Sequence, residues 1–166
     1  PGQFAFVSAF GMGEAPFGLS SLAYKKGALE FAVRRIGTVT RALHELEPGD
    51  KLGIRGPFGN SFPLNDYKEK NIFIIGGGIG MAPLRPVINT ILDNRADYGE
   101  FTILNGARTP TDLVFANEFQ AWSQAPNTRL ELTVDRGDDN WTGRVALIPA
   151  VVSELKPSPE NTIAII

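Results

Sequence analysis

The sequence has 166 residues, a formal net charge of −2, 43% hydrophobic residues and 20% charged residues, as ordinary folded proteins do. This charge gives no electrostatic basis for nucleic-acid binding. No apolar run approaches the roughly 20 residues that a membrane-spanning helix needs, so we expect neither nucleic acid nor membrane insertion. With no cysteine and one histidine, His44, we also expect no metal site and no catalytic acid–base residue.

The first third of the chain predicts β structure. Apolar or alternating stretches at residues 4–9, 29–34 and 51–55 are separated by glycine and proline turns and predict strands. A short helix is expected at 40–47, with Thr40 as its N-cap and Pro48 after its end. Short strands with one small helix favour a Greek-key barrel over a sandwich.

From residue 71 the pattern changes to buried strands alternating with helices, which is typical of a parallel α/β sheet. The predicted strands are 71–75, 101–105, 130–134 and 162–166, and the predicted helices are 82–94, 113–123 and 146–155. A polar, charged stretch at 62–70 connects the two halves. We therefore predict two domains, a partial β-barrel at 1–65 and an α/β domain at 66–166. Because the sequence starts at Pro1 and stops within an apolar run, we expect it to be a fragment.

Residues 75–87, IGGGIGMAPLRPV, place four glycines between the first parallel strand and its helix. Glycine allows positive φ and close approach of a ligand, and a helix N-terminus at this place favours a dinucleotide phosphate. The other interpretation is a tight turn without a ligand. The G-x-G-x-x-G fingerprint is not met, because Met81 and Pro83 stand where its last glycine would fall. A nucleotide would therefore bind in a different manner, or not at all.

Five stretches in order, PGQF, GEAPFGLSS, GPFGNSFP, GGGIGMAPLRPVI and DRGDDNWTGRV, resemble the ferredoxin–NADP reductase superfamily. Within it, the chain is similar to the gamma, diaphorase-type subunits of cytoplasmic nickel–iron hydrogenases and sulfhydrogenases. The corresponding subunit of anaerobic sulfite reductase and the electron-transfer subunit of dihydroorotate dehydrogenase are near relatives. The resemblance implies a flavin-binding barrel followed by a parallel-sheet domain that binds NAD(P)H.

The resemblance also implies a flavin site. It assigns the isoalloxazine ring to Phe17, Gly18, Leu19 and Ser20. Two residues depart from the family pattern: Ala15 replaces an arginine that neutralises the diphosphate, and Gly18 replaces a serine or threonine near flavin N5. A backbone N–H group, Ser20 or Ser21 is expected to serve at N5 instead.

The flavin diphosphate is expected at the start of the short barrel helix. The residues concerned are Gly37, Thr38, Val39 and Thr40. A glycine and hydroxyl groups at a helix N-terminus form an anion site independently of any resemblance, and Arg34 and Arg35 would add positive charge. The alternative is that Thr40 only caps the helix.

For the nicotinamide nucleotide, the resemblance places the pyrophosphate over the glycine loop. The loop residues are Gly77, Gly78, Ile79, Gly80 and Met81. Arg108 and Asp112 would contact the adenosine half, unless they form only an i,i+4 surface pair. Asp135 and Arg136 would read the 2′ position, where an arginine can accept a 2′-phosphate and an aspartate repels it. With both side by side, we slightly favour NAD over NADP.

The function that the resemblance implies is an electron-transfer flavoprotein subunit with FAD and NAD(P)H, working in the cytoplasm. Its partners would be the iron–sulfur and catalytic subunits of a hydrogenase or of a sulfur or sulfite reductase complex, and a two-iron, two-sulfur cluster is expected only in a C-terminal part beyond these residues. Hydride transfer between stacked rings at about 3–3.5 Å needs no acid–base side chain. The alternatives are a stand-alone NAD(P)H–flavin reductase and a non-catalytic nucleotide-binding module.

Overall fold

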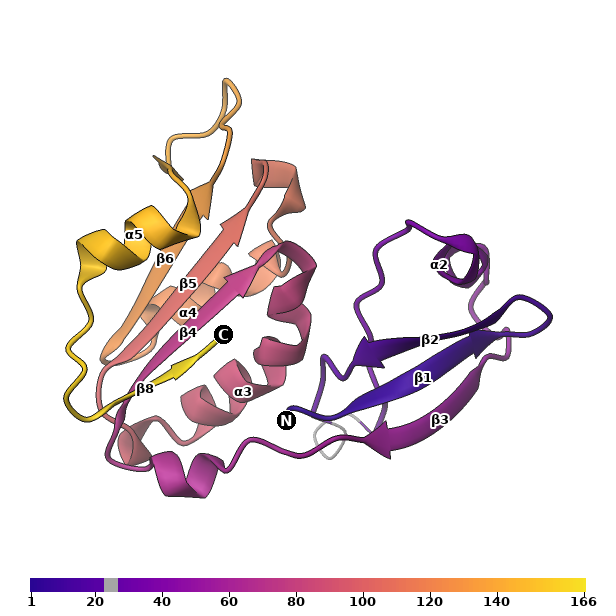
Figure 1. Ribbon diagram of the computed structural model, residues 1–166, viewed down its shortest axis with the longest axis horizontal. Helices are drawn as coiled ribbons and strands as arrows, with labels where there is room; N and C mark the ends of the chain where they lie inside the picture. The colour runs from indigo at the N-terminus through magenta and orange to yellow at the C-terminus, as the bar shows by residue number, and fades with distance from the viewer. Residues whose placement is uncertain (23–26) are drawn as a thin grey trace.

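The computed structural model describes residues 1–22 and 27–166, which form two lobes side by side (Figure 1). We call residues 1–58 the β lobe and residues 71–166 the α/β lobe. The described part of the β lobe contains an antiparallel sheet in the order β2-β1-β3, and the α/β lobe contains a parallel sheet in the order β7-β6-β5-β4-β8. The predicted combination of a barrel-like antiparallel sheet with a parallel α/β sheet is thus confirmed.

The sheet of the β lobe is built from β1 (Phe4–Ala9), β2 (Gly13–Gly18) and β3 (Gly53–Phe58). The predicted strand at 4–9 is present, and the third strand lies a few residues later than predicted. The sequence did not indicate β2, because glycines at both its ends and Pro16 within it hide any alternation.

The strand predicted at 29–34 is wrong: these described residues form no strand. Two serine hydroxyls accept hydrogen bonds from amides that would otherwise donate to a neighbouring strand. Ser21 Oγ accepts the N–H of Glu30 at 2.8 Å, and Ser20 Oγ accepts the N–H of Ala32 at 3.2 Å. Serine side chains compete with neighbouring strands for backbone hydrogen bonds. Glu30 and Ala32 therefore bind to serine side chains, and residues 29–34 do not pair as a strand.

The helix of the β lobe, α2 (Thr38–His44), begins two residues earlier than predicted. Its N-cap is Gly37, in extended conformation, and Thr40 is the third helical residue. Thr40 Oγ1 accepts the N–H of Gly37 at 2.8 Å and that of Ile36 at 2.9 Å. The threonine therefore stabilises the helix start from inside the first turn, and the N-cap assignment of Thr40 is wrong.

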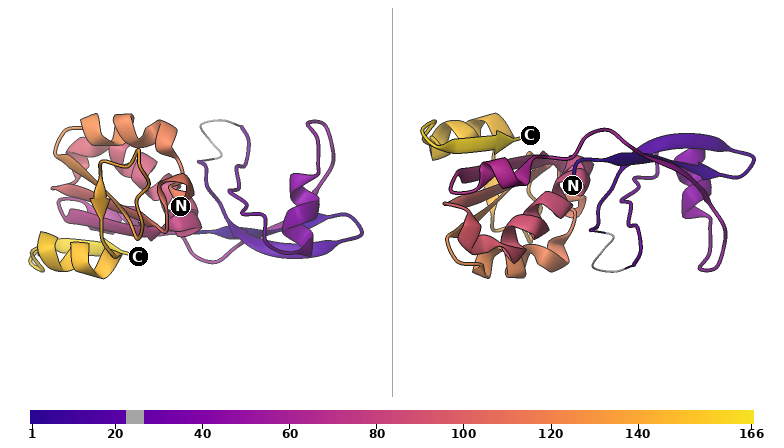
Figure 2. Two further views of the ribbon diagram at one scale, coloured as in Figure 1. Left: turned by 90° about the horizontal axis from the view of Figure 1, so that it is seen from above. Right: turned by 90° about the horizontal axis from the view of Figure 1, so that it is seen from below.

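The α/β lobe has three layers, with β4 (Asn71–Gly77), β5 (Phe101–Ala107) and β6 (Thr128–Val134) at the centre of its sheet. Two helices, α3 (Met81–Asp93) and α4 (Phe119–Gln124), cover one face, and α5 (Ile148–Leu155) lies on the other (Figure 2). Helices on both faces explain why the central strands are continuously apolar rather than alternating.

Each face of the central strands belongs to a separate buried cluster. Ile74 and Ile103 pack with residues of α3 on one side, whereas Phe73 and Leu104 pack with Val151 of α5 on the other.

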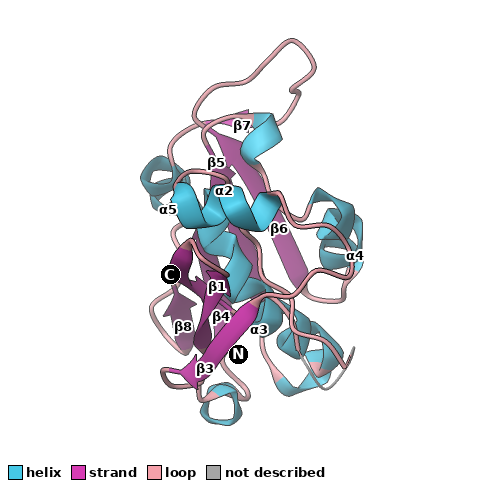
Figure 3. Ribbon diagram, turned by 90° about the vertical axis from the view of Figure 1, so that its right-hand side faces the viewer, coloured by secondary structure: helices cyan, strands magenta, loops and turns pink. Residues whose placement is uncertain are grey.

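The edge strands are β7 (Arg144–Val145), which was not predicted, and β8 (Thr162–Ile165). Figure 3 shows α4 and α5 on opposite sides of the sheet. No helix among the described residues is long and apolar enough to cross a membrane.

Two element boundaries differ from the prediction for backbone reasons. Phe115 adopts a left-handed conformation, with φ 63°, so α4 begins only at Phe119 after short 3₁₀ turns at Pro110–Asp112 and Ala116–Glu118. A non-glycine residue with this φ interrupts a right-handed helix. The first parallel strand runs on to Gly77, so Gly76 and Gly77 belong to β4 rather than to the loop after it.

Candidate functional site

The glycine loop lies where the connections of the parallel sheet diverge. β4 is bordered by β5 on one side and by β8 on the other, so the chain leaves the carboxyl end of β4 toward one side and returns to its other side. Ligands of open α/β sheets bind at such a switch point. Gly78–Gly80 form a short 3₁₀ turn there, which leads directly into α3.

The glycines at the end of β4 and in the loop after it have different surroundings. A Cβ at Gly76 would lie 2.5 Å from Cε and 3.2 Å from Cα of Met81, so a side chain there would require the buried Met81 to move. Gly78 has φ +52°, and a Cβ at Gly78 or Gly80 would meet no protein atom within 4 Å. Packing therefore fixes the base of the loop, while its outer side is open to a ligand that approaches the main chain.

The helix after this loop suits an anion. α3 has 13 residues and no acidic side chain in its first turn. Pro83 lies in that turn, where a backbone N–H would have no partner within the helix, so the missing N–H of proline costs no helical hydrogen bond. The side chain of Met81 is 0% exposed, and its N–H bonds to the carbonyl groups of Gly78 and Ile79. Contrary to the expectation for Met81, its side chain packs in the core and does not face the open side of the loop.

The structure brings three of the predicted adenosine-side residues together. The N–H of Asp135 donates to the carbonyl of Ala107 at 2.9 Å, and the N–H of Arg136 donates to that of Arg108 at 3.0 Å. These bonds continue the β5–β6 pairing beyond both strands, and Arg108, Asp135 and Arg136 are exposed. Two arginines and one aspartate therefore share the carboxyl edge of the sheet.

Asp112 lies close to this edge but has other partners. Its carboxylate accepts a hydrogen bond from Thr109 Oγ1 at 2.8 Å and forms an ion pair with Arg34 of the β lobe at 3.1 Å. Asp112 therefore pairs across the lobes, and not with Arg108 as the alternative interpretation held. Arg35, the other arginine expected to add charge at the flavin diphosphate, is paired with Glu45 at 3.3 Å.

In the β lobe, two of the flavin candidates, Phe17 and the start of α2, lie on one face of the sheet. Phe17 is paired with Ala5, on the face where Gly13 is paired with Ala9. A Cβ at Gly13 would contact Val39 of α2 at 3.6 Å, so Phe17 and the start of α2 lie on the same side. The predicted ring-packing residue and the predicted diphosphate segment are thus compatible with one bound molecule.

The structure also explains the unusual glycine at position 18. A Cβ at Gly18 would lie 2.7 Å from Cβ of Pro83, which no side chain tolerates without movement. Position 18, assigned to the N5 edge of a flavin, therefore touches the first turn of α3, whose N-terminus is the glycine loop. The two candidate binding segments meet at this contact.

The two serines considered for N5 have structural roles. Ser20 is 1% exposed and accepts the N–H of Ala32. Ser21 Oγ accepts the N–H of Glu30 and donates to the carbonyl of Ala28 at 3.4 Å. Both hydroxyls hold the 28–32 segment in place, whereas Leu19 is anchored by its own N–H, which donates to the carbonyl of Gln3 at 3.1 Å.

Sequence reasoning missed Arg85, which joins the two lobes. Its guanidinium bonds to Glu118 of the α/β lobe and, from Nη1, to Glu30 of the β lobe at 2.6 Å. The hydrogen bond to Glu118, assisted by that to Glu30, outweighs burial and raises the pKa of Arg85 above its usual value, so the group is charged at any physiological pH. A charged residue one turn after the glycine loop was the only signal in the sequence.

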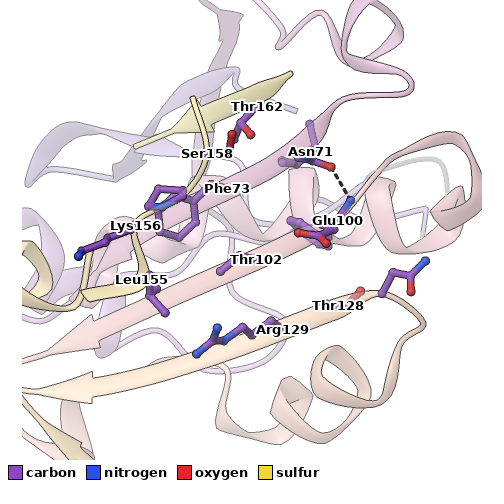
Figure 4. Close-up of a pocket in the computed structure, with 14 residues that line it drawn as sticks. Asn71, Phe73, Glu100, Thr102, Thr128, Arg129, Leu155, Lys156, Ser158 and Thr162 are labelled. Carbon is purple, nitrogen blue, oxygen red and sulfur yellow. Dashed lines mark hydrogen bonds between the residues drawn. The ribbon is translucent and has the colours of Figure 1, made fainter. Parts of the chain in front are cut away.

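A cavity of about 470 Å³ lies at the opposite end of the sheet, where strands β4, β5 and β6 begin. Asn71, Glu100 and Thr128 line its strand side, and Leu155 and Lys156 line its helix side (Figure 4). Asn71 Oδ1 accepts the N–H of Glu100 at 2.8 Å. Because the glycine loop is at the carboxyl ends of the same strands, this cavity is separate from the candidate nucleotide site.

Residues 74–166 match the family described as "Oxidoreductase NAD-binding domain". The chain is 38% identical over 165 residues to the sulfhydrogenase 1 subunit gamma of Pyrococcus furiosus, covering 98% of this chain and 56% of that protein. It is 38% identical over 145 residues to a probable dihydroorotate dehydrogenase B (NAD⁺) electron transfer subunit of Methanocaldococcus jannaschii, covering 86% of this chain and 49% of that one. The chain thus spans about half the length of the curated relatives it matches.

Solved structures show the same fold. A cytochrome P450 reductase from Amycolatopsis superposes with a TM-score of 0.82 at 24% identity, over 98% of this chain and 51% of that one. A ferredoxin–NADP⁺ reductase from Neisseria gonorrhoeae, solved with bound FAD and NADP, superposes with a TM-score of 0.79 at 18% identity, over 98% and 71%. These similarities confirm the predicted fold, that of the ferredoxin–NADP reductase superfamily, and the resemblance to hydrogenase gamma subunits.

Proposed function

Because the chain belongs to the oxidoreductase NAD-binding domain family, we propose that it is the flavin- and NAD(P)H-binding part of an electron-transfer subunit. It would pass electrons in the cytoplasm between NAD(P)H and an iron–sulfur partner of a hydrogenase or of a sulfur or sulfite reductase complex. The observation that carries this proposal is the contact of Gly18 with Pro83. It supports a shared site, because it joins the segment assigned to the flavin to the helix assigned to the nicotinamide nucleotide.

In this proposal the α/β lobe holds NAD(P)H. The main chain of Gly77, Gly78, Ile79 and Gly80 and the N-terminus of α3 receive the pyrophosphate. Arg108, Asp135 and Arg136 contact the adenosine ribose, and Asp135 favours NAD over NADP. Asp112 acts there indirectly, through its ion pair with Arg34.

The β lobe holds FAD in the same proposal. Phe17 packs beside the ring system, Gly18 and Leu19 border it with main-chain groups, and Ser20 supports that border from the core. The main-chain N–H groups of Gly37, Thr38, Val39 and Thr40 receive the diphosphate. The Thr40 hydroxyl already accepts two N–H groups, so its contribution there is made by the backbone. The two-iron, two-sulfur cluster of the relay would be held outside these residues.

When bound together, the nicotinamide and the flavin supply hydride transfer, and the protein's task is to hold the two ring systems in contact and away from water. Gly18 is suited to this task because it adds no side chain between the lobes. Hydride transfer between aligned rings needs no proton transfer to the protein.

The test is to purify the complete protein without oxygen and to measure its flavin content and visible spectrum. We expect flavin absorbance that bleaches when NADH or NADPH is added, with tighter binding of NADH. Absence of flavin, or a flavin that neither nucleotide reduces, contradicts the proposal. A protein that binds nucleotide by calorimetry without any hydride transfer would be a binding module instead.

A second measurement addresses the partner. We expect electrons from NADH to reach a one-electron acceptor through the iron–sulfur and catalytic subunits that copurify with the protein. Turnover with a free electron acceptor should rise when those subunits are present. Equal turnover with and without them would identify a stand-alone reductase.

A further inference from the structure

Arg85 lies in the second turn of α3, between the two lobes. On the α/β side, its Nε donates to Glu118 Oε1 at 2.8 Å, and a second nitrogen donates to the same oxygen. On the β side, Nη1 donates to Glu30 Oε2 at 2.6 Å and to the carbonyl of Ser20 at 2.8 Å. One side chain therefore bonds to both lobes at once.

The environment of Arg85 leaves it little freedom to move. Its side chain is 12% exposed, and Phe115 lies with its ring centroid 4.8 Å from the guanidinium carbon. Phe115 is the residue held at φ 63°, a conformation that costs energy outside glycine. The strained turn brings both the Phe115 ring and Glu118 to the arginine, so the α/β lobe fixes the plane of the guanidinium.

On the β side, the partners of Arg85 belong to one hydrogen-bonded unit. The N–H of Ser20 donates to the carbonyl of Glu30 at 2.9 Å, and Ser20 Oγ accepts the N–H of Ala32 at 3.2 Å. Ser20 lies two residues after Gly18, which touches Pro83 in the first turn of α3. Arg85 thus holds the segment that carries Gly18 against the helix that starts at the glycine loop.

We propose that Arg85 is a positioning residue for hydride transfer, because it fixes the Gly18–Ser20 segment against α3 and thereby sets the separation of the two ring systems. This inference rests on the proposed function. The hydride, with both electrons, leaves C4 of the nicotinamide and bonds to N5 of the flavin, so NADH is oxidised and the flavin reduced. Arg85 takes no part in the bond changes and acts only on geometry.

The geometry also explains why an arginine is needed. A planar guanidinium presents five donors in a fixed arrangement, so it can bond to two carboxylates and a carbonyl in different directions. A lysine at the same place offers a flexible point charge and does not fix the mutual orientation of three acceptors. Charge alone would therefore not replace Arg85.

The experiment compares Arg85→Gln and Arg85→Lys with the wild-type protein, with Arg129→Gln as the matched control. Arg129 pairs with Glu131 at 2.6 Å within β6, so this pair lies outside the β lobe and the glycine loop. The first readout is hydrogen exchange at the amides of Ser20 and Ala32, without added nucleotide. We expect faster exchange in both Arg85 variants and no change in Arg129→Gln.

The second readout is the limiting rate of flavin reduction, measured by stopped flow with the NADH concentration varied. Since a displacement of about 1 Å costs on the order of 100-fold in rate, we expect Arg85→Gln to lose about 10- to 100-fold. The KM for NADH should stay within about 2-fold, because the glycine loop is intact. Arg85→Lys should remain folded and lose nearly as much rate.

Three results would overturn the proposal. Unchanged exchange at Ser20 and Ala32 would show that Arg85 does not hold the segment. A lower stability with a normal limiting rate would show a purely structural role, and a full restoration of the rate by lysine would show that charge is sufficient. If the wild-type flavin is not reduced by either nucleotide, the proposed function fails together with the kinetic role, while the exchange data still decide separately whether Arg85 joins the lobes.

Discussion

The two lobes are stabilised in different ways. The α/β lobe buries large side chains completely, among them Trp122, Phe101 and Ile103. In the β lobe the buried strand residues are the small Ala5, Val7 and Ala9. On the same lobe Phe10 is 70% exposed and Ile54 48% exposed, and α2 contains no buried residue. Within the described residues, therefore, the α/β lobe removes more apolar area from water than the β lobe does.

The two candidate binding segments belong to different lobes. The glycine loop belongs to the α/β lobe, where Gly76 packs against Met81. The segment that carries Gly18 belongs to the lobe with the smaller core, and it is held from outside through α3. The proposed site is therefore shared by two lobes that are joined through the Gly18–Pro83 contact and the hydrogen bonds of Arg85.

The largest expected effect tests this comparison directly, by the same substitution in a strand of each lobe. Ile103→Ala should lower the free energy of unfolding by about 2–5 kcal/mol, because it leaves a cavity in a fully buried cluster. Ile54→Ala in β3 should cost less than about 1 kcal/mol, since half of that side chain is already in water. Urea unfolding of both variants gives the values. Equal losses would show that the β lobe has a core as tight as that of the α/β lobe.

The next effect concerns the contact between the lobes. Gly18→Ala should destabilise by about 1–3 kcal/mol, because the new methyl group overlaps Pro83 and forces the lobes to adjust. Gly77→Ala is the matched control: Gly77 also ends a strand, and its Cβ would meet Ile148 at an ordinary 3.5 Å. Thermal unfolding measures both variants. A tolerated alanine at position 18, with the control equally tolerated, would mean that the lobes are not in fixed contact.

A third pair of variants separates backbone strain from ligand binding. Gly78 in the α/β lobe and Gly11 in the β lobe both have positive φ, and a Cβ at either would meet no protein atom within 4 Å. Alanine at either position should cost about 1–2 kcal/mol for the left-handed backbone. Only Gly78→Ala should also weaken NADH binding, by about 10-fold, because the methyl group stands where the ligand approaches. Calorimetry that finds equal affinity in both variants would place the nucleotide elsewhere.

The smallest expected effect appears at alkaline pH, at Tyr98 in the α/β lobe, which donates to the carbonyl of Leu64 in the connecting segment at 3.2 Å. Burial raises the pKa of Tyr98 above its usual value. Above about pH 10 the unfolded chain loses this proton first, so the free energy of unfolding falls as pH rises further. Tyr98→Phe should show a shallower fall, with Tyr67→Phe as the control for loss of a phenol. Parallel curves for wild type and Tyr98→Phe would contradict this assignment.

Much of the α/β lobe could be predicted from the sequence because its elements are determined locally. The apolar runs at β4 and β5 and the glycines before α3 indicate their secondary structure without reference to distant residues. The β lobe was harder, since a strand exists only with a partner: the alternation at 29–34 has none among the described residues, and β2 had no pattern to reveal it.

Within the site, sequence patterns located the glycine loop and the segment at Gly18. They did not reveal how the two are joined, because Arg85 meets Glu30 across 55 positions of the chain, and no local pattern records which distant carboxylate a charged side chain will reach. For the same reason neither the adenosine contact expected for Asp112 nor the alternative pair with Arg108 pointed to Arg34, which lies 78 positions earlier. The burial of Ser20 could not be predicted either, because it depends on the distant residues that pack around its segment.

The cavity at the amino-terminal ends of the strands offers a practical advantage. Ser158 on its rim is exposed, and the 166 residues contain no cysteine, so a cysteine introduced there would accept a fluorophore at a single place within this sequence. The dye would lie across the full length of the sheet from the glycine loop. It could therefore report unfolding of the α/β lobe, or anchor the molecule to an electrode, without obstructing the glycine loop.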